Sequence, residues 1–227
     1  MKKILILILF PLLYTASFAQ YKFLAPNASN QYDAKVFVND YNKNICSGKG
    51  TVIIYDKATN REVQSFHSEN LIFTLNEKQK GELGWLELGK YQSPMIFGDF
   101  NFDGNEDIAI RNGTNPKNNS AAYDIYLFNS ANNFVLDPQL TKLASTNMGM
   151  FLTDKVNKQV SIEEETGCCI HKTIHFQKND KEQWAEVSSV IEDLSVTDYV
   201  TVITQTLIDG KIKRTVEKFK TKDYYKQ

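Results

Sequence analysis

The sequence predicts an all-β protein: a degenerate, small β-propeller-like fold of antiparallel strands with one strand-loop-strand calcium site. Short runs rich in β-branched and aromatic residues follow one another, and clusters of Asn, Asp and Gly separate them. No apolar stripe at helical spacing persists over three turns. Dense short strands are typical of sandwiches, barrels and propellers. At about 40–45 residues per blade the chain could form about five blades, although no clean repeat is visible.

The first nineteen residues read as a cleaved secretory signal peptide. Lys2 and Lys3 precede an apolar run at residues 4–13, and Ser17 and Ala19 are small residues of the kind found at cleavage sites. The apolar run is shorter than the roughly 20 residues that cross a bilayer. We therefore expect a signal peptide at 1–19, a single domain at 20–227, and a periplasmic or secreted location.

The strands are expected at regular intervals along that domain. They are predicted at residues 34–39, 51–55, 62–67, 71–75, 95–99, 107–111, 124–128, 134–135, 160–164, 170–177, 184–191, 199–207 and 211–220. Residues 57–60 form a predicted hairpin turn, and Asp209-Gly210 is a strong hairpin signal. Residues 136–143 have room for one short turn of helix.

The charge balance excludes one class of partner. The formal net charge is -1, whereas a protein that binds nucleic acid needs a basic face to neutralise phosphates. One short segment is basic: the C-terminal hairpin carries Lys211, Lys213, Arg214 and Lys218. Lysines and arginines commonly protect an edge strand from pairing with other chains, which explains them. They could also bind an acidic partner. We expect no nucleic acid and no stable membrane insertion after signal cleavage.

A calcium loop is the sharpest motif in the chain. Oxygen-bearing side chains recur at Asp99, Asn101, Asp103, Asn105 and Asp107, and Gly104 allows a sharp turn. Calcium takes six to eight oxygen ligands, and the first six positions match an EF-hand loop. Asn105 would contribute its backbone carbonyl, and Asp107 would close the site in place of the usual twelfth-position Glu. The alternative is a solvated Asn/Asp turn without metal.

The three cysteines predict one disulfide and one free thiol. Export into an oxidising compartment favours a disulfide, and adjacent cysteines rarely bridge each other. Cys46 paired with Cys168 or Cys169 is therefore the expected bridge.

Cys169, His171 and His175 could also suggest a zinc site or a Cys–His nucleophile, but the two histidines would lie about 13 Å apart on a strand. The run at residues 163–165, three glutamates, reads as a solvated edge.

The calcium loop also supports a family resemblance. Phe97, Gly98 and Asp99, followed by Asn101, Asp103, Gly104 and Asp107, resemble the loop of FG-GAP repeats in integrin-type β-propellers. The chain also resembles small exported bacterial proteins that have one such loop. This resemblance spans residues 94–176 and includes residues 123–128, 133–135, 140–143 and 167–171. That group includes periplasmic immunity proteins that inhibit lysozyme-like peptidoglycan hydrolases.

The resemblance implies a non-catalytic, calcium-stabilised binding protein. Its partner is expected to be a secreted or periplasmic cell-wall hydrolase, whose cleft would accept the polar side chains of Asn112, Asn115, Lys117, Asn118, Asn119 and Ser120. Calcium bound just before this segment would hold its root rigid. The alternative is a carbohydrate- or surface-binding module of adhesin type.

Overall fold

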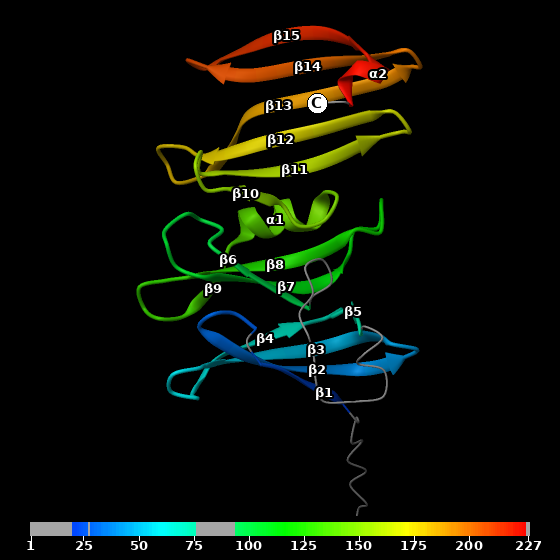
Figure 1. Cartoon of the computed structure of the whole chain (residues 1–227). Helices are drawn as coiled ribbons and strands as arrows, with labels where there is room; N and C mark the ends of the chain where they lie inside the picture. Colours follow the sequence, from blue (N-terminus) through cyan, green and yellow to red (C-terminus); the bar gives the residue numbers. More distant parts are fainter. Residues whose placement is uncertain (1–19, 27, 76–93, 226–227) are drawn as a thin grey trace, which may run out of the picture.

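A computed structural model describes residues 20–26, 28–75 and 94–225, which form three antiparallel sheets (Figure 1). The expected signal peptide at 1–19 lies outside these residues. The first sheet contains β1 (Tyr21–Ala25), β2 (Tyr32–Asn42), β3 (Ile45–Asp56), β4 (Glu62–Ser68) and β5 (Phe73–Thr74). Along β2 the side chains of Tyr32, Ala34, Val36 and Val38 are buried and their neighbours are half-exposed, as expected for a strand with one face on a core.

The second sheet lies in the middle of the molecule and is followed by the helix α1 (Pro138–Thr146). Its strands, in hydrogen-bonding order, are β6 (Met95–Gly98), β7 (Asp107–Thr114), β8 (Ala121–Phe128) and β9 (Phe134–Leu136). Asp137 begins α1, because its Oδ1 accepts a hydrogen bond of 2.8 Å from the Leu140 backbone N–H. The short helix expected around residues 136–143 is therefore present and extends to nine residues.

The third sheet begins beside α1 and extends away from it (Figure 1). Its strands, in order, are β10 (Leu152–Asp154), β11 (Gln159–Thr166), β12 (Ile170–Lys178), β13 (Trp184–Val196), β14 (Tyr199–Ile208) and β15 (Lys211–Lys220). The predicted Asp209-Gly210 turn joins β14 to β15, and both residues have positive φ, 50° and 73°. The short helix α2 (Thr221–Tyr224) follows β15.

The middle sheet is buried on both faces. Ile108 and Ile110 of β7 pack into a core with the first sheet, whereas Ala109 packs into a second core with α1 and the third sheet. Successive residues of a strand point to opposite faces, so a strand between two cores is apolar without alternation. This explains the continuous run Ile108-Ala109-Ile110.

The all-β prediction is confirmed, and the propeller-like arrangement is not seen. Each sheet is paired mainly in sequence order, as in a propeller blade. None of the three described sheets closes on itself, and they lie one after another along the molecule (Figure 1). The propeller is therefore not shown, and the same short strands also fit layered open sheets. No helix in the described ranges is long and apolar enough to cross a membrane.

Candidate functional site

The predicted calcium loop connects β6 to β7, which confirms the strand-loop-strand expectation. Its side chains fold inward onto its own backbone. Asp99 accepts hydrogen bonds from the N–H groups of Asp103 (3.1 Å) and Gly104 (3.2 Å). Asn101 Oδ1 also accepts from the Asp103 N–H, at 3.1 Å, and Asp103 Oδ1 accepts from the Asn105 N–H, at 2.8 Å. The loop is thus already curled around the oxygens of Asp99, Asn101 and Asp103.

Asp107 differs from the other acidic residues because it is fully buried. Its Oδ2 accepts a 2.7 Å hydrogen bond from the Phe100 N–H, and its Oδ1 accepts one of 2.9 Å from the Phe128 N–H. Burial raises the pKa of Asp107 to about 6, and the nearby charges of Asp103 and Asp99 add to this rise, while the two N–H groups oppose it. Asp107 therefore joins the start of the loop to β8.

The donor set of the loop suits calcium, since it consists of carboxylate and amide oxygens. Asp99 and Asp103 lie close enough to Asp107 to raise its pKa. Even so, no three acidic, His or Cys side chains within the described ranges gather tightly enough to form a metal site. Asp107 already uses both oxygens within the fold. The calcium site at Asp99, Asn101, Asp103, Asn105 and Asp107 thus stays a prediction.

The two phenylalanines between the oxygen-bearing residues attach the loop to the third sheet. Phe100 is 4% exposed and packs edge to face against Phe151, with the ring centroids 5.6 Å apart. Phe102 packs against Trp184 of β13 at 6.2 Å. Gly98 leaves room for the Phe100 ring, because a Cβ at position 98 would lie 2.7 Å from a Phe100 ring carbon. The loop therefore joins the second sheet to the third.

The predicted partner-binding residues lie at the other end of β7. The turn from β7 to β8 occupies residues 115–120, and its base is held by the backbone carbonyl of Asn147, just after α1. Three groups donate to this oxygen: Asn115 Nδ2 at 3.2 Å, Asn118 Nδ2 at 3.4 Å and Ser120 Oγ at 2.7 Å. Asn115 is buried, whereas residues 116–119 are exposed. The turn has an ordered base and an exposed tip.

The structure places two features of this segment differently from the sequence expectation, while the partner-binding role stays a prediction. Asn112 lies within β7 and is engaged, since it donates to Asp124 Oδ2 at 2.8 Å and accepts from Ser68 Oγ at 3.2 Å. The calcium loop cannot hold the root of the turn, because the eight residues of β7 separate them by roughly 25 Å. The contacts to Asn147 hold the root instead. Lys117 and Asn119 remain at the exposed tip.

The tip borders a cleft that sequence reasoning did not find. The cleft measures about 460 Å³, and Lys117 and Asn118 line one side of it. Glu163, Glu164 and Glu165, at the end of β11, line the other side. These carboxylates continue into a neighbouring pocket with His171, whose Nδ1 lies 3.3 Å from Glu165 Oε1. Glu163, Glu164 and Glu165 are exposed, as expected for a solvated edge, and the packing of α1 against both sheets brings them close to the turn.

The predicted disulfide from Cys46 to the Cys168/Cys169 pair is wrong. Cys168 and Cys169 bridge each other in the three-residue turn between β11 and β12, with Cα atoms 3.7 Å apart. Cys46 is buried in the first sheet and is a free thiol. The middle sheet separates the two locations (Figure 1), so the close Cα approach that a bridge requires is not available. A nucleophilic Cys169 thiolate is also ruled out in this oxidised state.

We expect cysteine mapping to find one free thiol, and to find it at Cys46. Burial raises the pKa of Cys46 to about 12, so the thiol stays protonated and unreactive in the folded protein. Unreduced protein should therefore resist alkylation when folded and take up one label at Cys46 in urea. Labelling of Cys168 or Cys169 without reductant would contradict the vicinal bridge.

Comparison with known proteins supports the fold and gives no information on the function. A solved structure described as that of a Xanthomonas type IV secretion system related protein superposes with a TM-score of 0.62 and 18% sequence identity. The match covers 86% of this chain and 92% of that chain. At this identity the likeness is one of fold alone. No protein-family model matches the chain, and no curated protein matches it.

Proposed function

We propose that the protein is an exported, non-catalytic binding protein that inhibits a peptidoglycan hydrolase by inserting the tip of the 115–120 turn into its cleft. The observation that carries the proposal is the construction of this turn. Its base is fixed by three hydrogen bonds to one carbonyl, and its tip exposes Lys117 and Asn119. A segment ordered before binding loses little conformational entropy when it binds.

The charge at the tip fits a hydrolase cleft. Glycoside hydrolases commonly use a pair of carboxylates at the scissile bond, and the ammonium group of Lys117 can form charge-assisted hydrogen bonds with them. Lys117 forms no ion pair with the described residues of its own chain, so no internal contact must be broken. Glu163, Glu164 and Glu165 on the opposite wall would repel those same carboxylates, which fixes the orientation of the partner.

The test is inhibition of lysozyme-like peptidoglycan hydrolases, followed as peptidoglycan turbidity. Lys117→Ala should weaken inhibition at least about 30-fold, corresponding to the 2 kcal/mol lower limit for losing one partner of a buried charge pair. The melting temperature should not change, because the Lys117 side chain is exposed.

Lys155→Ala is the matched control, since Lys155 lies in another exposed turn that borders neither pocket. This variant should inhibit like the unaltered protein. Full inhibition by Lys117→Ala would remove the tip from the mechanism. No inhibition by the unaltered protein, together with binding to a glycan or cell surface, would favour the adhesin-type module.

Calcium is the second part of the proposal, as a structural ion and not as part of the inhibitory surface. The loop joins the second sheet to the third through Phe100 and Phe102, so an ion that holds its oxygens should stabilise the fold. At 100 times the dissociation constant, calcium should add about 2.7 kcal/mol to the free energy of unfolding. Asp103→Ala should abolish this increment, and inhibition at 25 °C should persist in chelator.

Calorimetry and thermal melts with calcium and with chelator measure the effect. A melting temperature that does not respond to calcium, combined with no heat of binding, would refute the metal site. Loss of inhibition in chelator while the fold is intact would instead connect the ion to the 115–120 turn.

A further inference from the structure

The last strand of the third sheet is a long edge without a partner. β15 has ten residues, pairs only with β14 and forms the end of the molecule farthest from the first sheet (Figure 1). Nine of its ten residues are exposed. In such an edge strand, alternate residues direct their backbone N–H and C=O groups outward. Helix α2 does not cover this edge, because it turns back toward the sheet, where Thr221 binds the carbonyls of Asp198 and Thr197.

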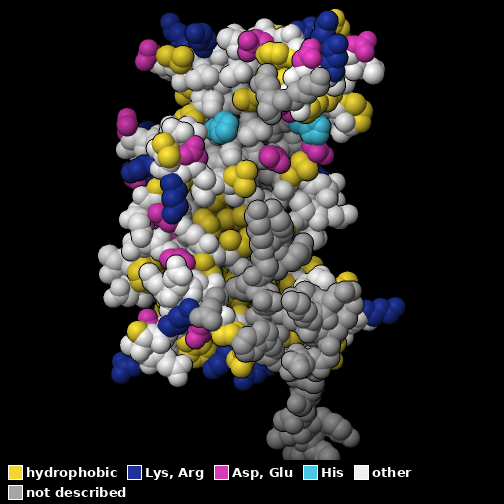
Figure 2. Space-filling model, in the orientation of Figure 1, with side chains coloured by type: hydrophobic (Ala, Val, Ile, Leu, Met, Phe, Trp, Pro, Cys, Tyr) yellow, Lys and Arg dark blue, Asp and Glu magenta, His cyan; other side chains and the backbone are white. Residues whose placement is uncertain are grey.

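The side chains of β15 give the edge a distinct chemistry. Five of the ten are basic and one is acidic: Lys211, Lys213, Arg214, Lys218, Lys220 and Glu217. Figure 2 shows Lys and Arg side chains at both sides of this end of the molecule, with hydrophobic and acidic side chains between them. Within β15 itself, Ile212 is 70% exposed and Val216 is 53% exposed. A purely protective edge needs the lysines and gains nothing from exposed Ile and Val.

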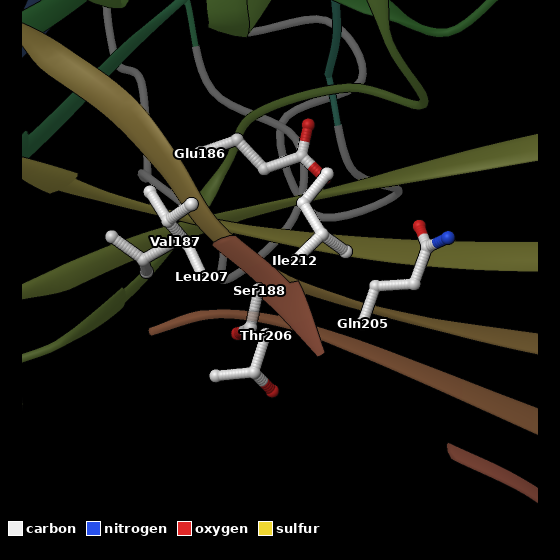
Figure 3. Close-up of a pocket in the computed structure, with 7 residues that line it drawn as sticks. All are labelled: Glu186, Val187, Ser188, Gln205, Thr206, Leu207 and Ile212. Carbon is white, nitrogen blue, oxygen red and sulfur yellow. The ribbon is translucent and has the colours of Figure 1, made fainter. Parts of the chain in front are cut away.

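A pocket lies beside the start of the strand. It measures about 190 Å³, and Leu207 and Ile212 line it together with Val187 of β13 (Figure 3). Leu207 and Ile212 are directly paired across β14 and β15, and Val216 lies on the same face of β15. A strand added along the edge would have an apolar side chain within reach of this pocket.

We propose that the β15 edge binds an extended acidic segment of another protein as an added antiparallel or parallel strand. The backbone edge provides the hydrogen bonds, the basic side chains provide the charge selectivity, and the pocket accepts an apolar side chain. The acidic segment is favoured over a second copy of this chain, because two β15 strands side by side would bring ten basic side chains together with only two acidic ones. The proposal does not depend on the 115–120 turn.

The probe is a labelled ten-residue peptide of alternating valine and glutamate, with binding followed by fluorescence anisotropy. Hydrogen exchange provides the readout of strand addition, and the amides of residues 211–220 should become protected when the peptide binds. Lys213→Glu combined with Lys218→Glu should weaken binding at least tenfold. The matched control, Lys155→Glu combined with Lys158→Glu in the exposed turn between β10 and β11, should leave it unchanged.

Two further peptides test whether pairing, and not charge alone, holds the segment. A version with proline at its centre keeps the carboxylates but cannot complete the ladder, so it should bind at least tenfold more weakly. A valine–lysine version should not bind. Equal binding of the proline version, absent protection of residues 211–220, or no binding of the valine–glutamate peptide would each overturn the proposal.

Discussion

Replacement of Asp107 by alanine is expected to lower the free energy of unfolding by about 2–6 kcal/mol. The side chain is fully buried, and its two oxygens accept from the N–H groups of Phe100 and Phe128. A buried donor left without a partner costs about 1–3 kcal/mol, and two such donors would remain. Urea denaturation in chelator measures this loss without any contribution from calcium.

Asp103→Ala is the matched control for that experiment. Asp103 is exposed, and its side chain accepts within the loop from the Asn105 N–H. In chelator its removal should cost less than about 1 kcal/mol, although it should abolish the response to calcium. Equal losses for the two variants in chelator would show that the interactions of Asp107 with Phe100 and Phe128 do not stabilise the fold.

The pH dependence provides an independent check on Asp107. Its pKa is raised from the ordinary value of 3.8 to about 6, so the folded protein holds this proton more tightly than the unfolded chain. The contribution is fully present below about pH 3.8 and is lost as the pH rises through about 6. In chelator, the stability advantage of the unaltered protein over Asp107→Ala should therefore decrease between pH 4 and 6. An advantage that grows over that interval would contradict the assignment.

Truncation of Phe100 is the second large effect expected, at about 3–5 kcal/mol of lost unfolding free energy. The ring is 4% exposed, packs against Phe151 and belongs to the core between the second and third sheets. Gly98→Ala should reproduce part of the loss, because its new Cβ would lie 2.7 Å from the same ring.

Val156→Ala is a suitable control for Phe100→Ala, since Val156 is 92% exposed and should tolerate the change within about 0.5 kcal/mol. Separate unfolding of the third sheet in Phe100→Ala, detected as early exchange of amides in residues 159–208, would support the role of the loop as a connection. A loss below about 1 kcal/mol for Phe100→Ala would show that the loop does not join the sheets.

Local patterns in the sequence predicted the elements well where neighbouring residues decide the conformation. The Asp209-Gly210 turn formed as expected, because both residues tolerate positive φ. The loop between β6 and β7 also formed between two strands, as its alternating Asp and Asn residues indicated. In contrast, β1 was missed, since its residues 21–25 carry little alternation and form a strand by pairing with β2.

The sequence by itself determined the all-β class, the order of most strands and the position of the oxygen-rich loop. Only the tertiary structure decided the open, layered arrangement, the pairing of Cys168 with Cys169, and the meeting of the 115–120 turn with Glu163, Glu164 and Glu165. The physical reason is the distance along the chain over which each interaction acts. Turn and strand preferences act between residues a few positions apart, whereas this cleft depends on packing α1 between two sheets, which brings together groups about 45 residues apart in the chain.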